Sequence, residues 1–535
     1  MTDQTLTYHN RRFLEILKER FGKKLGIGTK EKKYNPKHEI SHNPKKATVK
    51  AQPKQQPKTL ELVLPSKKRI ATAGPRGICH DVYDYLQKTA LVMAPEKDIH
   101  LGNIRHINLN DAGSEKQIVS DISYNSFMLF SHLACLMNQG TVFYQGTPGA
   151  SKTSIAKLVA HHIYGISLDS IEKATIKGHE GISDTDMLAM LDMGLLIKEG
   201  KEVPRARPFV KSMVRIIDEV NRLGPQQRNM LYSIASDGEV EYRGKIFKAP
   251  QGPLFATANY ADAGNSELEV PFLDRLDVQI EASSLNPWYI ELFSNRKNKN
   301  LKRELENIVN SKPSSLSVED FRQARHEISG MKFSEEAMSK LAYFIAEINY
   351  CFMARKEVSK KKKGLASRVK PGNALCSKCT HYSASGDNLC YMTENEITPR
   401  SVRAIFNFTS GLAWWLGKKE VGLEELRAVI PYTLSHKLVP TDKAVQADAF
   451  YENDRPAFVA ELFEKAERTY DLAAQKAPVI EKLTRIVYDV YRHGDKSNVS
   501  KKEVMDMINN EVSNIDSPAK FSLSTALYDV AERLK

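Results

Sequence analysis

A run of eight residues, Gly146 to Thr153, has the composition and spacing of a loop that binds phosphate: Gly-Thr-Pro-Gly-Ala-Ser-Lys-Thr. In such a loop, successive backbone N–H groups surround a phosphate at the start of the following helix, where anions are favoured. Lys152 can neutralise phosphate charge, and the Thr153 hydroxyl can bind Mg²⁺. The sequence therefore predicts a site for ATP or GTP; a chance match to the pattern is the alternative. The candidate contacts are Gly146, Thr147, Pro148, Gly149, Ala150, Ser151, Lys152 and Thr153.

The residues on either side of this loop fit a nucleotide site. Thr141–Gln145 is a short β-prone run, and Ser154–Ile163 has the apolar spacing of a helix. Gly146 and Gly149 permit the bends that the loop needs. The loop departs from the common pattern at one position, because Ser151 stands where that pattern has glycine.

Two acidic residues form a candidate second half of the site. Met213–Glu219 is a β-branched run that ends in Asp218 and Glu219, as expected for a buried parallel strand whose carboxyl end meets a ligand. Asp218 can hold hydrated Mg²⁺, and Glu219 can orient and polarise the attacking water. This pattern is common by itself, but Lys152 lies 66 residues upstream. The combination is more specific than either motif.

A third apolar strand and a later arginine complete the set of candidate residues. Pro253–Asn259 ends in an amide that could hold the attacking water or the γ-phosphate opposite Glu219. Arg275 could stabilise charge on the transferred phosphoryl group, often from a neighbouring subunit. An ion pair with Asp274 or Asp277 within the chain is the alternative for this arginine.

Together these features resemble the MoxR branch of the AAA+ ATPases. Further similarity lies in Thr398-Pro399-Arg400 at a helix start and in Ile430–Leu438, so that the resemblance spans roughly residues 117–440. It implies an α/β P-loop AAA+ core with a parallel sheet flanked by helices, an α-helical lid, and a ring that is usually hexameric. In that family the position of Ser151 is often alanine, so the serine is a mild departure.

The resemblance also implies a role for each matching residue. These roles are Walker A contacts for Lys152 and Thr153, Walker B for Asp218 and Glu219 within Asp218–Arg222, first sensor for Asn259, finger toward the adjacent subunit for Arg275, and second sensor for Arg400, with Arg403 as a competitor. Asp237–Phe247 resembles the hairpin that this branch inserts within its second helix, which commonly faces the ring pore or the substrate. Its alternation and two glycines independently predict a hairpin.

A cysteine cluster lies between a helix predicted at Ser334–Phe352 and another that begins at Pro399. Cys376 and Cys379 have the two-residue separation of a chelating turn, and His381 with Cys390 would complete a tetrahedral set. We therefore expect structural Zn²⁺. The alternatives are an iron–sulfur cluster, free thiols, and replacement of His381 by a ligand from elsewhere in the chain.

Charge is concentrated at the start of the chain. The net charge is +13, but residues 1–75 hold 18 Lys or Arg against 6 Asp or Glu, so the remaining chain is nearly neutral. Because Lys23–Pro57 is poor in large apolar residues, we expect this tail to be mostly disordered, with a short helix near Tyr8–Phe21. It is either a solvated tail or a segment that binds nucleic acid, an anionic surface or an acidic partner.

Four segments are expected in all: the tail over 1–75, an α/β nucleotide-binding domain over 76–290, a lid over 291–440 with a Cys-rich insertion at 358–397, and a helical region over 441–535. The last segment could form a helix-turn-helix unit, but few basic side chains near its end favour a helical bundle. No apolar run reaches the roughly 18 residues that span a bilayer, and no signal peptide is evident, so a soluble, cytoplasmic protein is expected.

These expectations favour an ATPase that remodels or assembles a protein complex. The resemblance implies a von Willebrand A-domain partner, which must be a separate chain because the Asp-x-Ser-x-Ser metal motif fails here, even at Asp121–Asn125. The main alternative is a nucleic-acid-dependent motor, which the nearly neutral body disfavours. A scaffold without turnover is a third possibility, and the intact Asp218-Glu219 pair argues against it.

Overall fold

The computed structural model describes ten stretches of the chain, all within the unit Lys67–Lys535. They are residues 74–89, 98–100, 123–149, 151–260, 268–282, 315–350, 389–476, 479–493, 499–512 and 519–534. The basic tail and its predicted helix at Tyr8–Phe21 lie outside the described residues.

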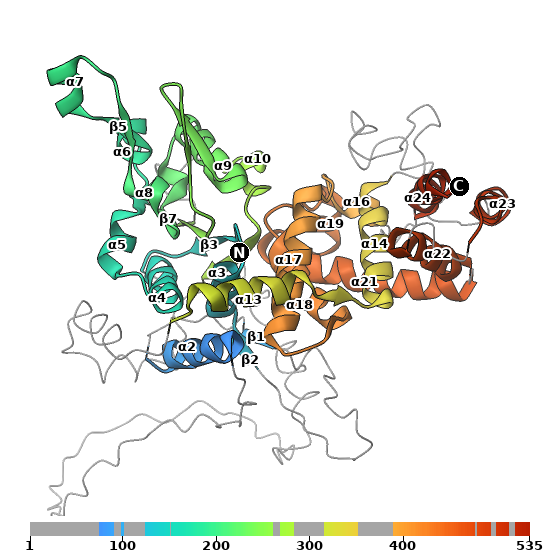
Figure 1. Ribbon diagram of the computed structural model, residues 1–535. Coiled ribbons are helices and arrows are strands. Elements are labelled where there is room, and N and C mark those ends of the chain that lie inside the picture. The colour runs from blue at the N-terminus through green and yellow to red at the C-terminus, as the bar shows by residue number, and fades with distance from the viewer. Residues whose placement is uncertain are drawn as a thin grey trace, which may run out of the picture. The chain divides into compact units, whose positions relative to one another are not determined.

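A five-stranded parallel sheet organises the first half of the described chain (Figure 1). Its order is β11 (Val278–Ala282), β3 (Thr141–Gly146), β10 (Leu254–Ala258), β7 (Arg215–Asp218) and β4 (Thr175–Lys177). Every neighbouring pair is parallel. Apolar residues dominate these strands because helices cover both faces of the sheet. The predicted strands at Thr141, Met213 and Pro253 are confirmed as β3, β7 and β10.

Alternate residues of the central strands β3, β10 and β7 face two different hydrophobic cores. Val142 and Tyr144 of β3 join one core, and Phe143 joins the other. The first core is covered by α2 (Pro75–Thr89), α3 (Ser126–Leu136) and α4 (Lys152–Tyr164). The second is covered by α6 (Asp184–Met187), α8 (Pro208–Lys211), α9 (Pro225–Asp237) and α10 (Val270–Leu273). The result is the parallel sheet flanked by helices that the sequence predicts. The remaining elements of this half are β1 (Asp98–His100), β2 (Ser123–Asn125), α5 (Leu168–Lys173) and the 3-10 turn η1 (Val220–Arg222).

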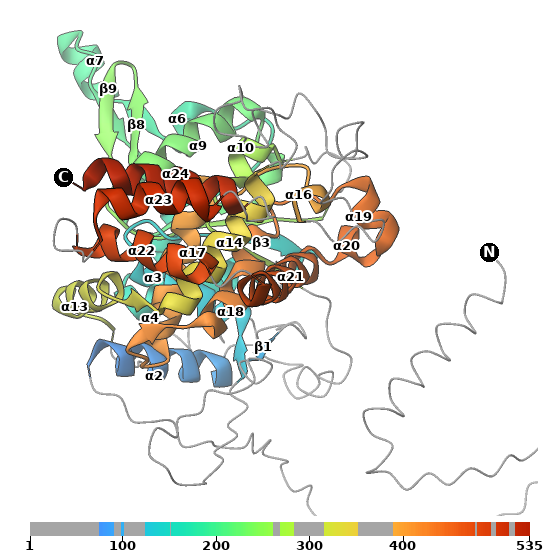
Figure 2. The ribbon, with the colours of Figure 1, turned by 90° about the vertical axis from the view of Figure 1, so that its right-hand side faces the viewer.

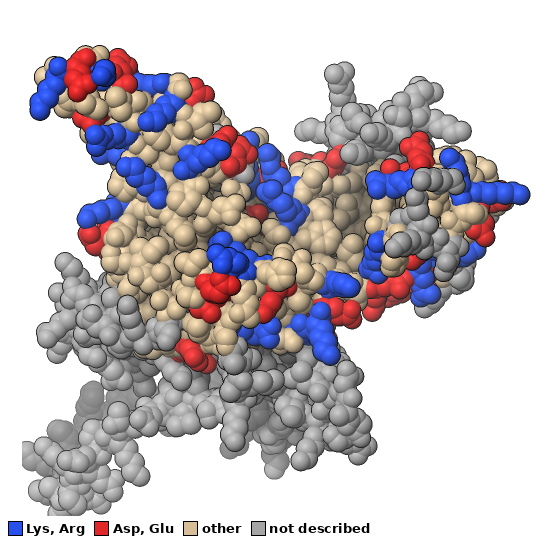
Figure 3. All heavy atoms as spheres, in the orientation of Figure 1, with Lys and Arg blue, Asp and Glu red and all other residues tan. Residues whose placement is uncertain are grey.

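The predicted hairpin forms, but its predicted place in the fold was wrong. Strands β8 (Glu239–Tyr242) and β9 (Lys245–Lys248) pair with each other and lie after α9 and before β10. They do not lie in the helical segment between β4 and β7, where the resemblance implied the hairpin. That earlier segment holds a different insertion: β5 (Ala189–Leu191), α7 (Met193–Glu199) and β6 (Pro204–Ala206). The hairpin lies beside this insertion (Figure 2), where Arg243 pairs with Glu202 at 3.2 Å. Figure 3 shows Lys, Arg, Asp and Glu side chains intermixed over the projecting α7 end.

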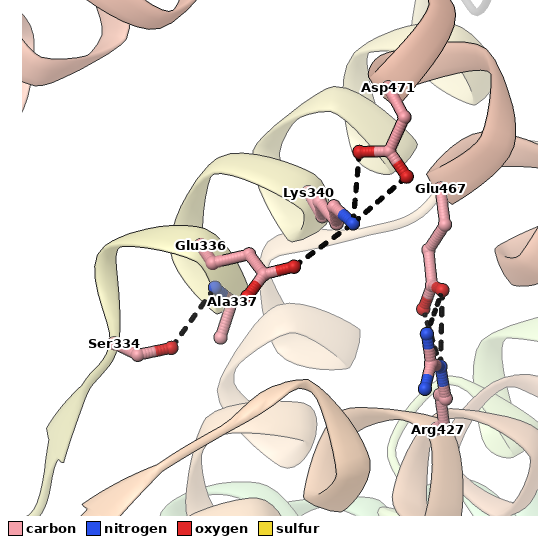
Figure 4. A network of polar contacts seen from close by, with 7 residues as sticks. All are labelled: Ser334, Glu336, Ala337, Lys340, Arg427, Glu467 and Asp471. Atoms are coloured by element: carbon pink, nitrogen blue, oxygen red, sulfur yellow. Dashed lines mark hydrogen bonds and ion pairs between the residues drawn. The ribbon is translucent and has the colours of Figure 1, made fainter.

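Helices form the second half of the described chain. The elements from the end of the sheet to residue 476 are α13 (Val318–Ser329), β12 (Lys332–Phe333), α14 (Glu335–Asn349), α16 (Leu389–Met392), α17 (Pro399–Trp415), β13 (Glu420–Val421), α18 (Leu423–Leu434), α19 (Asp442–Ala447), α20 (Phe450–Asn453) and α21 (Arg455–Lys476). The predicted starts at Ser334 and Pro399 are confirmed, since Ser334 and Thr398 cap α14 and α17. Figure 4 shows Lys340 of α14 between Glu336 and Asp471, at 3.1 and 3.0 Å, which ties α14 to α21.

The C-terminal region is helical, as predicted. It contains α22 (Val479–His493), α23 (Lys501–Asn510) and α24 (Ala519–Arg533), which pack with α14 and α21 on one hydrophobic core. Ser500 and Glu503 form the predicted capping box of α23. Among the described residues no helix is long and apolar enough to cross a membrane.

Candidate functional site

The phosphate loop joins the end of β3 to the start of α4. Gly146 has a φ of +156° and lies so close to β11 that a Cβ would be 2.4 Å from the Ala282 carbonyl oxygen. Gly149 has a φ of +80°. Ser151 also has a left-handed backbone, with φ 57° and ψ 16°. This conformation explains why glycine is usual at that position. Ala150 lies outside the described residues.

The ammonium of Lys152 is buried inside the loop. Its Nζ donates to the carbonyl oxygens of Gly146 and Thr147, both at 2.8 Å, and to Asn259 Oδ1 at 3.0 Å. Burial lowers the pKa of Lys152, while the nearby carboxylates of Asp218 and Glu219 act in the opposite direction. The lysine is therefore a cation held where a phosphate would enter the loop.

Two predicted magnesium ligands meet between the start of α4 and the carboxyl end of β7. Thr153 Oγ1 donates to Asp218 Oδ1 at 2.5 Å. Thr257 Oγ1 donates to the same oxygen at 2.7 Å. Hydroxyl and carboxylate oxygens suit Mg²⁺, which keeps several waters and takes few protein ligands. The donor set of Thr153 and Asp218 therefore fits this ion.

Glu219 is held from three directions. Its backbone is left-handed, with φ 57°, and its N–H donates to Thr257 Oγ1 at 3.0 Å. Its carboxylate accepts from Asn259 Nδ2 at 2.9 Å and pairs with Arg222 Nε at 3.3 Å. Asn259 thus bridges Lys152 and Glu219, which lie on different segments of the sequence. The structure brings together five predicted residues at this edge of the sheet: Lys152, Thr153, Asp218, Glu219 and Asn259.

Thr257 and Arg222 are additional residues of this site that the sequence did not single out. Thr257 is 1 % exposed and lies two residues before Asn259, so the two side chains leave β10 on the same face. That spacing was the available signal for Thr257. Arg222 stood within the quoted Asp218–Arg222 motif, but no role followed from its spacing.

Arg275 lies apart from this network. It follows α10 in a turn, and its Nη1 donates to the Pro271 carbonyl oxygen at 2.6 Å. Arg400, at the start of α17, pairs with Asp274 at 3.5 Å. Arg403, which competes with Arg400 for the same predicted role, is exposed. The structure therefore places Arg400 beside the turn that carries Arg275.

The predicted zinc ligands are largely outside the described residues. Cys376, Cys379 and His381 are not described, and Cys390 is half-buried in α16. Within the described stretches, no group of three or more His, Cys, Asp or Glu is arranged to hold a metal.

Comparison with known proteins places the candidate nucleotide-site residues from Gly146 to Arg275 in one domain. Residues 141–276 match the AAA domain of the dynein-related subfamily. A crystal structure of a protein assigned as an ATPase, from Cytophaga hutchinsonii, superposes with a TM-score of 0.48 and 15% identity, covering 73% of this chain and 94% of that one. No curated protein matches the chain. The AAA match includes the phosphate loop, Asp218 at the end of β7, Glu219, Asn259 and Arg275.

Proposed function

We propose that this chain, an ATP-hydrolysing enzyme with an AAA domain, is a MoxR-like ATPase that assembles into a ring and remodels or assembles a protein complex. The observation that carries the enzymatic part is the chain of contacts from Lys152 through Asn259 to Glu219, beside the Thr153–Asp218 pair. It joins a phosphate-neutralising cation, a candidate base and a magnesium-binding pair in one place.

Each residue has a task that its position supports. ATP and Mg²⁺, when bound, would supply the phosphoanhydride and the charge that neutralises it. Thr153 and Asp218 would hold the ion, and Lys152 would exchange its loop carbonyls for phosphate oxygens. Glu219 would orient the attacking water, and Asn259 would contact both the phosphate side and the water side of the reaction.

The location of Arg275 on the sheet supports the proposed ring. Its carbonyl oxygen accepts from Thr141 Oγ1 at 3.4 Å, and Asp277 Oδ2 accepts from Thr141 N at 2.9 Å. Thr141 begins β3, whereas the phosphate loop follows Gly146 at the other end of this strand. A strand of that length separates the two ends by about 17 Å. An arginine side chain cannot span this distance, so Arg275 would serve a neighbouring subunit.

Arg400 shares this location through Asp274. We therefore propose that Arg400, as second sensor, also faces the neighbour's nucleotide. Each complete site would combine the loop, Asp218, Glu219 and Asn259 of one subunit with Arg275 and Arg400 of the next.

The β5–α7–β6 insertion and the β8–β9 hairpin are the proposed contacts with a protein client. Met193, Ile197 and Ile246 are 55%, 77% and 60% exposed on these elements. Protein contacts are marked by contiguous exposed apolar surface, and we propose that these side chains form such a surface. A separate von Willebrand A-domain protein remains the proposed partner.

A nucleic-acid motor is the less favoured function. Acidic and basic side chains are interspersed among other residues on the described part of the face in Figure 3, and that part shows no continuous basic surface. Phosphate neutralisation is the main source of non-specific nucleic-acid binding. If DNA or RNA stimulates ATP turnover and the stimulation fades with salt, the protein-remodelling proposal is wrong.

The enzymatic proposal is tested with Glu219→Gln. This variant should bind ATP with the affinity of the wild type and lose turnover by about a hundredfold or more, because the amide cannot accept a proton from water. Glu464→Gln, on the exposed face of α21, is the matched control and should retain turnover. Normal turnover in Glu219→Gln would refute the assigned role.

A further inference from the structure

We propose that the lid sets the position of Arg275 for the neighbouring subunit, through Thr398, His436 and Lys437. We call Asp274–Asp277 the finger turn, since it carries Arg275. All three are positioning residues: Thr398 and His436 bond to the turn, and Lys437 acts on it through its charge. The inference rests on the proposed function, in which Arg275 acts on the adjacent subunit.

The first contact is between α17 and Asp274. Thr398 Oγ1 donates to Asp274 Oδ1 at 2.6 Å, and Ser401 Oγ lies 3.5 Å from the same oxygen. Arg400 Nη1 lies 3.5 Å from Asp274 Oδ2. Asp274 directly precedes Arg275. Both of its carboxylate oxygens are therefore held by residues at the start of one lid helix. Thr398 also caps that helix by accepting from Ser401 N at 3.2 Å, so the cap and the finger turn share one side chain.

The second contact comes from the segment just after α18. His436 Nε2 lies 2.9 Å from the Leu276 carbonyl oxygen. A carbonyl oxygen only accepts, so Nε2 carries the proton and donates. Burial lowers the pKa of His436 well below its ordinary value, which keeps the ring neutral. The backbone directly after Arg275 is thus fixed by a residue that is 160 positions away in the sequence.

Lys437 adds an electrostatic effect as a buried charge, without a hydrogen bond from its Nζ to any described residue. It is 5% exposed, and its charge interacts favourably with Asp277 and Asp274, on both sides of Arg275. Burial lowers the pKa of Lys437 to about 8, against the effect of these carboxylates. A buried cation requires opposite charge close by, and removal of either partner leaves the other uncompensated. Lys437 and the finger turn are therefore coupled electrostatically as well as through the packed backbone.

These contacts join the lid to the turn on both sides of Arg275. Two lid segments hold it, one at Thr398 and one at His436–Lys437. A rotation of the lid relative to the sheet would therefore displace Arg275. Misplacing a catalytic group by about 1 Å can lower a rate about a hundredfold. Nucleotide-driven lid movement in one subunit would then change turnover in the next.

Mixed rings separate this role from a general effect on folding. Lys152→Ala subunits should not bind ATP productively but retain an intact finger turn. Thr398→Val and Lys437→Met subunits should bind a non-hydrolysable ATP analogue normally, yet show turnover at least about tenfold below that of the wild type. In rings mixed one to one with Lys152→Ala subunits, the turnover of each variant should be severalfold above the mean turnover of the two separate, unmixed proteins. The reference is Arg275→Ala, which should be rescued by the same partner.

Thr441→Val is the matched control for Thr398→Val. Thr441 also caps a helix, α19, accepting from Ala444 N at 3.3 Å and donating to the Tyr391 carbonyl oxygen at 3.0 Å, but it does not bond to the finger turn. It should retain near wild-type turnover, and Thr398→Ser should restore what Thr398→Val loses. Thermal unfolding of every variant identifies loss of folding.

The outcomes distinguish the two proposals. If Arg275→Ala is rescued and the Thr398 and Lys437 variants are not, the positioning role is wrong and the proposed function stands. If Arg275→Ala is not rescued either, Arg275 does not act between subunits, and both proposals fall. Equal loss in Thr441→Val and Thr398→Val would also overturn the positioning role, because the lost cap alone would then account for the defect.

Discussion

Replacing Ser151 with glycine should stabilise the nucleotide-binding domain. Ser151 has φ 57° and ψ 16°, and its side chain makes no capping hydrogen bond to α4. A Cβ in this left-handed conformation costs roughly 1–2 kcal/mol. Glycine loses about 0.5–1 kcal/mol more conformational free energy on folding than a residue with a side chain. The difference leaves a net gain of about 0.5–1 kcal/mol in the free energy of unfolding.

Urea unfolding and thermal unfolding measure this gain. For a domain of 150–250 residues, it corresponds to an increase of roughly 1–4 °C in Tm. The control is Ser151→Ala, which removes the hydroxyl but retains the Cβ and its left-handed strain. We expect no comparable stabilisation from alanine, and ATP affinity should not fall in the glycine variant, because the loop N–H groups are unchanged.

Two results would refute the reasoning. Destabilisation by Ser151→Gly would mean that the hydroxyl contributes more than the strain costs. Equal stabilisation by alanine and glycine would mean that the hydroxyl, and not the backbone conformation, is unfavourable. Only a gain confined to glycine supports strain in the loop.

Three further predictions concern other parts of the molecule. Thr257→Val removes the hydroxyl that joins Asp218 Oδ1 to Glu219 N, so kcat should fall about tenfold with little change in ATP affinity, and Thr257→Ser should retain most of it. Burial lowers the pKa of His132 to about 4, so below pH 6.5 the folded ring stays neutral while the unfolded one gains a proton. The free energy of unfolding should therefore fall by up to about 3 kcal/mol between pH 6.5 and 4. This fall should be smaller in His132→Asn. From the predicted cysteine cluster we expect about one equivalent of zinc in purified protein, which Cys379→Ser should lose; a metal-free wild type would contradict that prediction.

The sequence predicted the parts of the fold that depend on local pattern. The strands at Thr141, Met213 and Pro253 are short apolar runs, because both faces of a parallel sheet are buried. The helix starts at Ser334, Pro399 and Ser500 follow from side chains that cap the first turn. Such signals lie within a few residues of the element that they describe.

The parts that were missed depend on contacts between distant residues. The Thr398–Asp274 bond joins positions 124 residues apart, and no periodicity in either segment indicates it. The hairpin at Glu239–Lys248 formed as its alternation predicted, but alternation does not say which helix precedes it. Likewise, the residue type of Arg275 made it a candidate finger. Its location beside the start of β3, at the end away from the phosphate loop, became known only from the arrangement of the sheet.

The contacts of Asn259 connect nucleotide binding to activation of water. Its Oδ1 accepts from Lys152, and its Nδ2 donates to Glu219. The Asn259 amide therefore binds both Lys152 and the candidate base, Glu219. Arg222 also forms an ion pair with Glu219. If Lys152 turned to a bound phosphate, the Asn259 side chain would lose one of these two partners. We therefore expect the restraint on Glu219 to weaken only when the loop is filled, which would oppose activation of water in a subunit that holds no nucleotide. Asp218 is held separately by Thr257, so we expect the magnesium side of the site not to depend on this exchange.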